Sequence, residues 1–231
     1  MATDDEHAHR AMDRIPGEIA CLDTARLPAT LISTAGTHCE VWQQSGRIVR
    51  GEQQEAVDVV IKKFREPCSF PEARVYAREY RRLKAALDEM VPHTRFIFTR
   101  VDGRESVVVI AETFTPWFNI ANPVNSSEAV PLLRRLTRAR EQLARFLTAT
   151  RRWRDDADPK VIDLFGVDNL VLDRNYNLRY LDSFGVFFYE SLLHLLDEVD
   201  EGLKHKIDVS VRRLDYLEYL LAASAPTGEE T

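Results

Sequence analysis

The chain has 231 residues, enough for one large domain or two small lobes, and carries a formal net charge of -6. Because nucleic-acid-binding proteins usually have a basic excess, we expect no nucleic acid as a partner. No apolar run is long enough for a membrane span, and the N-terminus lacks a hydrophobic signal segment. Cys21, Cys39 and Cys68 form no C-x-x-C pair, so we expect free thiols in a cytoplasmic protein.

The first half of the chain predicts strands around one helix. Residues 1–28 are polar and predict an N-terminal arm or a short helix. The segments that follow, in order, are strand-turn-strand at 29–43, a turn bracketed by Gly46 and Gly51, a buried strand at 56–64, a helix at 70–90 and a hairpin at 95–114. The hairpin turns at Val101-Asp-Gly103, where glycine suits a tight turn.

The second half predicts mainly helices. Ser127 can cap a helix from Glu128 to Arg154, and 189–223 predicts helix in two pieces separated near Lys206. Two short strands, 169–173 and 178–182, lie between these helices and are joined by the polar turn Asn175-Tyr-Asn177. Residues 226–231 predict a disordered tail.

Asn169 and Asp182 flank this predicted hairpin and are candidate metal ligands. A hard ion such as Mg2+ prefers oxygen donors, and an amide carbonyl plus a carboxylate would supply them. Both residues could instead cap turns of an ordinary hairpin. The hairpin turn itself falls at 175–177, however, which leaves these two residues without that explanation.

Three motifs and the order of elements resemble the protein-kinase superfamily, over Leu31 to Phe188. Val59-Val-Ile-Lys62 is similar to the V-A-I-K motif, Glu79 lies on the following helix, and Asp182-Ser-Phe-Gly185 is similar to D-F-G with one residue inserted. The segment after Gly185 is short and lacks an A-P-E element. In this it looks like reduced bacterial kinase-like proteins of the YrbL-type and lipopolysaccharide-core-kinase-like groups.

The resemblance implies a two-lobed α+β fold and a nucleotide partner. Residues 29–115 would form a five-stranded antiparallel lobe with one helix, and residues 116–225 a reduced helical lobe. ATP and Mg2+ would be the cofactors, with Asn169 and Asp182 binding the metal. Gly36, Lys62 and Glu79 would bind the nucleotide or orient its ligands, Gly36 being the one glycine left in the expected phosphate loop. Lys63 is an alternative to Lys62 because a one-residue slip reverses the strand face, and Glu72 is an alternative to Glu79.

The catalytic base is the point at which the resemblance fails. The residue five before Asn169, where the family has its catalytic Asp, is Leu164, which cannot accept a proton. Asp163 and Asp168 are the candidate catalytic residues, or the reaction needs no base. The resemblance therefore implies either an atypical phosphotransferase or a pseudokinase.

Three alternatives to this interpretation stay open. Proteins resembling selenoprotein O retain the metal ligands and transfer AMP instead of phosphate. A degenerate kinase scaffold could also be a non-catalytic protein-interaction module, with a protein partner at Trp117-Phe118 or at the aromatic residues 184–189. The chain could also be an unrelated α+β domain. Loss of ATP binding in an Asp182→Ala variant would support the hypothesis of a kinase-like protein that binds ATP and Mg2+.

Overall fold

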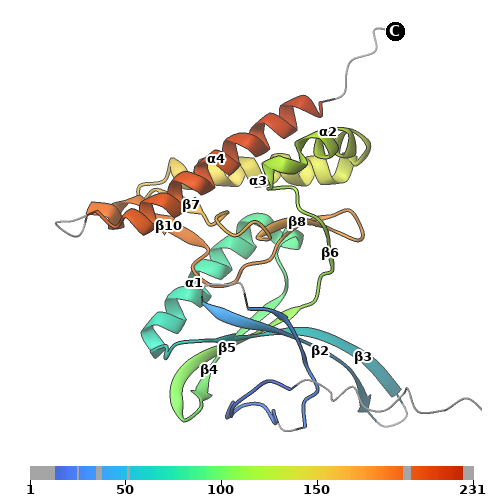
Figure 1. The fold of residues 1–231 in the computed structure, drawn as a ribbon, viewed down its shortest axis with the longest axis vertical. Helices are drawn as coiled ribbons and strands as arrows, with labels where there is room; N and C mark the ends of the chain where they lie inside the picture. The colour runs from blue at the N-terminus through green and yellow to red at the C-terminus, as the bar shows by residue number, and fades with distance from the viewer. Residues whose placement is uncertain (1–13, 25, 35–37, 51–52, 195–198, 226–231) are drawn as a thin grey trace, which may run out of the picture. The chain divides into compact units, whose positions relative to one another are not determined.

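A five-stranded antiparallel sheet forms the first of the two units into which the chain divides (Figure 1). The structure, a computed structural model, describes residues 14–24, 26–34, 38–50, 53–194 and 199–225. The first unit holds the described residues up to Val75 and His93–Thr113. The second holds Tyr76–Pro92 and the described residues from Phe114 onward. With four α-helices in the described residues, the chain is an α+β protein, as the sequence predicts.

The sheet has the strand order β1-β2-β3-β5-β4. Its strands are β1 (Thr30–Ser33), β2 (Cys39–Arg50), β3 (Gln53–Phe64), β4 (Thr94–Val101) and β5 (Arg104–Glu112). Helix α1 (Phe70–Leu87) and the 3-10 helix η1 (Asp88–Met90) lie between β3 and β4 in the sequence. This order of three strands, a helix and two strands confirms the prediction for the first half of the chain.

The hairpin between β4 and β5 also confirms its prediction. Asp102 and Gly103 have φ values of 51° and 78°, so both central residues of the turn are in the left-handed region. A two-residue turn of this kind matches the twist of antiparallel strands. The turn predicted between Gly46 and Gly51 is wrong at its start, because β2 continues to Arg50 and Gly46 is paired with Val57 on β3. Gly51 lies outside the described residues.

The N-terminal segment covers one face of the sheet. Ile15 and Ile19 pack in a buried cluster with Trp42, Ile61 and Val108 of the sheet. Residues 14–24 contain no helix and run as an irregular segment, so of the two predictions for this region the arm is correct here. Burial of these isoleucines stabilises this segment against the sheet without a helical apolar stripe.

Helices and short strands make up the second unit. Its strands are β6 (Pro116–Phe118), β7 (Lys160–Ile162), β8 (Leu170–Asp173), β9 (Leu178–Tyr180) and β10 (Phe187–Tyr189). Besides the later turns of α1 and the 3-10 helix η1, its helices are η2 (Pro123–Asn125), α2 (Ser126–Arg135), α3 (Thr137–Arg154), η3 (Glu190–His194) and α4 (Glu201–Ala223). One small sheet has the order β6-β8-β9, and β7 pairs with β10.

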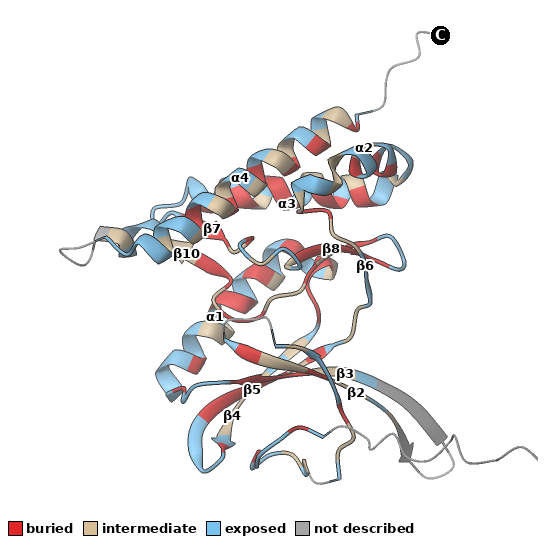
Figure 2. Ribbon diagram, viewed as in Figure 1, coloured by how far each residue is buried: buried red, intermediate tan, exposed pale blue. Residues whose placement is uncertain are grey.

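The short strands are the buried part of this unit. Every residue of β7 and β8 is buried (Figure 2), and α3 and α4 pack against each other and against β7. Strands β8 and β9 form the predicted hairpin, with Leu170 opposite Tyr180. None of the described helices is long and apolar enough to cross a membrane.

Three details of the second unit differ from prediction. The helix predicted from Glu128 to Arg154 is two helices, because Leu136 has a non-helical ψ of 75° that ends α2. The break predicted near Lys206 is wrong, since α4 runs without interruption from Glu201 to Ala223. The side chain of Asp200 caps this helix by accepting from the Leu203 N–H. Strands β6, β7 and β10 were not predicted, because at three residues each they are too short to show a periodic pattern.

Candidate functional site

Asp163, Asn169 and Asp182 come from three strand ends of the second unit. Asp163 follows β7, Asn169 precedes β8 and Asp182 lies two residues after β9. Because β8 and β9 are antiparallel neighbours, the start of one lies beside the end of the other. The Leu181 N–H accordingly donates to the Asn169 carbonyl at 2.9 Å, which brings Asn169 next to the segment that carries Asp182.

The Asn169 side chain joins β8 to the loop after β7. Its Nδ2 donates to the Asp163 carbonyl at 3.1 Å, and its backbone N–H donates to the Gly166 carbonyl at 3.2 Å. Since the amide nitrogen is used in this way, Oδ1 is the atom left to bind a cation. A Cβ on Gly166 would lie only 2.5 Å from Oδ1, so the close approach requires glycine at this position.

Asp182 is held by its own turn. Its Oδ1 accepts the backbone N–H of Ser183 at 2.6 Å and of Phe184 at 3.3 Å. This fixes the carboxylate in orientation, while Oδ2 accepts no hydrogen bond from the described residues. The second oxygen is therefore available to an external donor or cation.

Asp163 lies near Asp182 and is affected by its charge. Burial, followed by the negative charge of Asp182, raises the pKa of Asp163 to about 6, against the lowering effect of backbone N–H groups and of Lys206. Its Oδ1 accepts the Phe165 N–H at 2.7 Å. The pair of neighbouring carboxylates is a centre of negative charge that a cation would stabilise.

The loop that follows Asp163 is held against α4. The Leu164 N–H donates to Ser210 Oγ at 3.1 Å, and Arg213 donates to the carbonyls of Leu164 and Phe165. Leu164 is fully buried, so the residue at the expected position of the catalytic Asp is part of the core. Asp163, one residue earlier, is only half-buried.

Tyr180 supports the same loop from β9. Its buried hydroxyl donates to the Asp163 carbonyl at 3.0 Å. Burial, together with the charges of Asp182 and Asp163, raises the pKa of this hydroxyl well above its ordinary value. Tyr180 therefore stays protonated and keeps its role as a donor.

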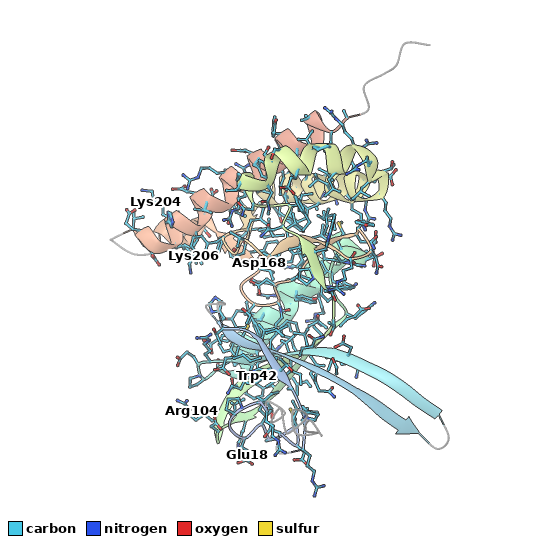
Figure 3. All side chains as sticks on the ribbon, turned by 45° about the vertical axis from the view of Figure 1, so that its right-hand side comes forward. Glu18, Trp42, Arg104, Asp168, Lys204 and Lys206 are labelled. Atoms are coloured by element: carbon cyan, nitrogen blue, oxygen red, sulfur yellow. The ribbon has the colours of Figure 1, made fainter. Side chains whose placement is uncertain are left out.

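Asp168, the other candidate base, has a different partner. Its exposed carboxylate accepts from Asn119 Nδ2 at 3.0 Å (Asp168 is labelled in Figure 3). Of the two candidates, Asp163 is therefore the one that the described contacts bring to Asn169 and Asp182.

Glu79 lies in the part of α1 that belongs to the second unit. Its buried carboxylate accepts from the Tyr189 hydroxyl at 2.9 Å. Burial raises the pKa of Glu79, while Tyr189 and the charges of Arg78, Arg82 and Lys160 oppose the rise. Burial and the Glu79 charge raise the pKa of Tyr189 to about 12. The alternative residue Glu72 is exposed and instead caps the start of α1 through Ser69.

In the first unit, Lys62 and Lys63 lie on opposite faces of β3. Lys63 Nζ donates to the Pro16 carbonyl at 3.0 Å and lies 3.3 Å from Glu40 Oε2, on the face covered by the N-terminal segment. Since successive side chains of a strand alternate, the buried Lys62 belongs to the opposite face. Lys63 is thus engaged within its own unit. The pairing of Lys62 with Glu79 stays a prediction, and Gly36 lies outside the described residues.

The donors at Asn169 and Asp182 fit a magnesium ion. Mg2+ in nucleotide sites usually binds one or two carboxylates and completes its shell with phosphate oxygens and water. One carboxylate and one amide oxygen suffice for that role. The described residues contain no group of three or more His, Cys, Asp or Glu side chains that could form a metal site made of protein ligands alone.

Several residues of this site could not be found from the sequence. Ser210 and Arg213 are more than 45 residues from the loop that they hold, and Tyr189 is 110 residues from Glu79. Such contacts have no local pattern. A comparison with models of known protein families and a search of curated proteins each found no match to this chain.

Proposed function

We propose that the chain is a kinase-like protein that binds ATP and Mg2+ and transfers the terminal phosphoryl group to an acceptor hydroxyl. One observation carries this proposal: the contacts that join Asn169, Asp163 and the segment of Asp182 within one unit. These are the residue types that a phosphotransferase of this class needs, two for the metal and one for the acceptor.

Asn169 Oδ1 and the Asp182 carboxylate are the proposed metal ligands. When bound, Mg2+ would neutralise negative charge on the phosphate oxygens. The hydrogen bond that Asn169 Nδ2 donates and the one that Asp182 Oδ1 accepts hold both side chains in orientation before any ligand arrives. A pre-organised ligand set of this kind costs little reorganisation on binding.

Asp163 is the proposed base. It would accept the proton of the acceptor hydroxyl while the hydroxyl oxygen bonds to the terminal phosphorus and ADP leaves. A pKa of about 6 suits this role, because the group is mostly ionised at neutral pH and still accepts a proton readily. On this proposal the loop between Asp163 and Asn169 is one residue longer than in the family, and Leu164 is a core residue.

The remaining expectations from the resemblance belong to the same proposal. They are the two-lobed kinase-like arrangement, phosphate binding by Lys62, orientation of Lys62 by Glu79 and a phosphate loop at Gly36. The five-stranded sheet with Lys62 buried on β3 and a helix after that strand supports them. A double-mutant cycle of Lys62→Met and Glu79→Gln on Mg·ATP affinity tests the pairing, and additive effects would reject it.

The experiment that tests the proposal is calorimetry with Mg·ATP combined with product analysis. We expect wild type to bind, Asp182→Ala to lose binding, and Asp163→Asn to retain binding while ADP formation falls by about 10²-fold or more. Asp168→Asn is the matched control and should retain both. Release of pyrophosphate instead of ADP would favour AMP transfer, and binding without turnover would favour a pseudokinase. Absence of Mg·ATP binding in wild type would refute the proposal.

One surface favours a second function, that of a protein-interaction module. Trp117 and Tyr176 are each 48% exposed, and their rings form a T-shaped pair with centroids 5.0 Å apart. Tyr176 has a φ of 61°, a costly conformation for a non-glycine residue that places its ring at the tip of the β8–β9 turn. Phe184 and Phe187 are buried and do not belong to such a surface. Cross-linking that requires Trp117 would support this function.

A further inference from the structure

One face of α4 contacts the loop between Asp163 and Asn169. Ser210 and Arg213 hold the loop backbone by hydrogen bonds, and His205 packs its ring edge-on to Phe165 with centroids 5.8 Å apart. Lys206 precedes Ser210 by four residues and Arg213 by seven, and this spacing places all three on the same side of a helix. Lys206 therefore belongs to the face of α4 that is turned toward the loop.

We propose that Lys206 binds the terminal phosphoryl group of the nucleotide at the site of Asp163, Asn169 and Asp182. This inference rests on the proposed function and adds a residue to it that none of the sequence motifs contains. It identifies the ligand as a nucleoside triphosphate, since a diphosphate would leave Lys206 without its partner.

The bonding state of Lys206 supports this role. Lys206 is half-buried and forms no hydrogen bond or ion pair with the described residues. Lys204, two residues earlier, is exposed and lies 3.6 Å from Glu201, and Lys160 is paired with Asp156 at 2.7 Å. Figure 3 shows Lys204 and Lys206 on opposite sides of α4, with Lys206 on the side of the loop that carries Asp168. A lysine that has no partner among the described residues is a ready binding group for an anion.

The charge of the site points in the same direction. The Lys206 charge acts on Asp163, although the two groups form no direct ion pair. A phosphoryl oxygen near Asp163 would be repelled by the two carboxylates unless cations were present. Lysine is well suited to this because its ammonium group acts as a compact point charge on phosphate. Lys206 would supply this charge alongside the metal.

The test compares a triphosphate with a diphosphate. Calorimetry with Mg2+ would measure the affinity of β,γ-imido ATP and of ADP for wild type, Lys206→Met, Lys206→Arg and the matched control Lys204→Met. We expect Lys206→Met to weaken the triphosphate by about tenfold or more and to leave ADP within about twofold, because one charged hydrogen bond is lost. Lys206→Arg, which keeps the charge, should recover most of the affinity, and Lys204→Met should match wild type.

The outcomes separate this inference from the proposed function. If wild type binds and Lys206→Met changes neither ligand, or weakens both equally, the assignment of Lys206 is wrong while the proposed function stands. If wild type binds neither nucleotide, the proposed function and this inference both fail. Circular dichroism of each variant checks that the fold is retained, and recovery in Lys206→Arg excludes a loss caused by misfolding.

Discussion

Gly166→Ala should damage the candidate site without removing any functional group. A Cβ at this position would lie 2.5 Å from Asn169 Oδ1, 2.9 Å from Cγ and 3.1 Å from Nδ2. All three of the nearest atoms belong to one amide, so rotation of that amide cannot relieve the contact. Ordinary contact begins at 3.4 Å, so the amide must retreat by about 0.9 Å.

The expected cost follows from this contact. Overpacking of a tight site typically destabilises a protein by about 1–3 kcal/mol. Gly166 does not have a positive φ, so alanine adds no backbone strain there and would otherwise stabilise the fold by about 0.4–1 kcal/mol. In an Asn169→Ala background the contact is gone, and Gly166→Ala should then be neutral or slightly stabilising. The two changes should therefore be coupled by at least about 1 kcal/mol.

Urea unfolding of wild type, both single variants and the double variant measures this coupling, with circular dichroism as the probe. Mg·ATP affinity is a second readout, because a displaced Asn169 oxygen would no longer meet the strict geometry of Mg2+. The reasoning would be refuted if Gly166→Ala had the same effect on stability in both backgrounds.

Two further predictions concern buried carboxylates. Asp173 is 2% exposed and accepts a hydrogen bond from Arg179 Nε at 2.7 Å, so Arg179→Met would leave its carboxylate as a buried charge without its cation. We expect this variant to be destabilised by about 3–5 kcal/mol in urea unfolding. Adding Asp173→Asn should recover part of the loss, and no recovery would contradict this cause. Tyr189→Phe should destabilise by about 1–3 kcal/mol by removing the hydrogen bond that Tyr189 donates to the buried Glu79 carboxyl group. The folded-state pKa of Glu79 is raised above its ordinary value of 4.5, so the stability of wild type falls as the pH rises from that ordinary value through the raised pKa. The hydrogen bond from Tyr189 lowers this pKa, so the variant should have a still higher pKa and lose more stability over the same rise in pH. Equal pH profiles of the two proteins would reject this.

Much of the fold was predictable because its signals are local. The β-branched residues of β3, the apolar stripe of α1 and the Asp102-Gly103 turn each act over a few neighbouring residues, and each element was found close to its observed place. The end of α2 at Leu136 and the continuity of α4 were not predicted. No glycine or proline marks that break, and no residue near Lys206 interrupts the helix.

Some residues of the candidate site could likewise be found from a local pattern, and others only from the fold. Asn169 and Asp182 could be found from the sequence because a hairpin fixes which residues flank it. Counting five residues back from Asn169 leads to Leu164, the position at which the kinase family has its catalytic Asp. Leu164 is buried and its backbone is bonded to α4, while Asp163 is the acidic side chain near Asp182.

By itself, then, the sequence determined the order of the elements, the acidic composition and the two oxygen donors at the hairpin. Only the tertiary structure decided which aspartate lies beside Asp182, which lysine of β3 is engaged by the N-terminal segment, and that Lys206 belongs to the face of α4 turned toward the loop. The physical reason is distance along the chain. Periodicity and turn chemistry act over a few residues, whereas burial and charge at this site come from segments that only folding brings together.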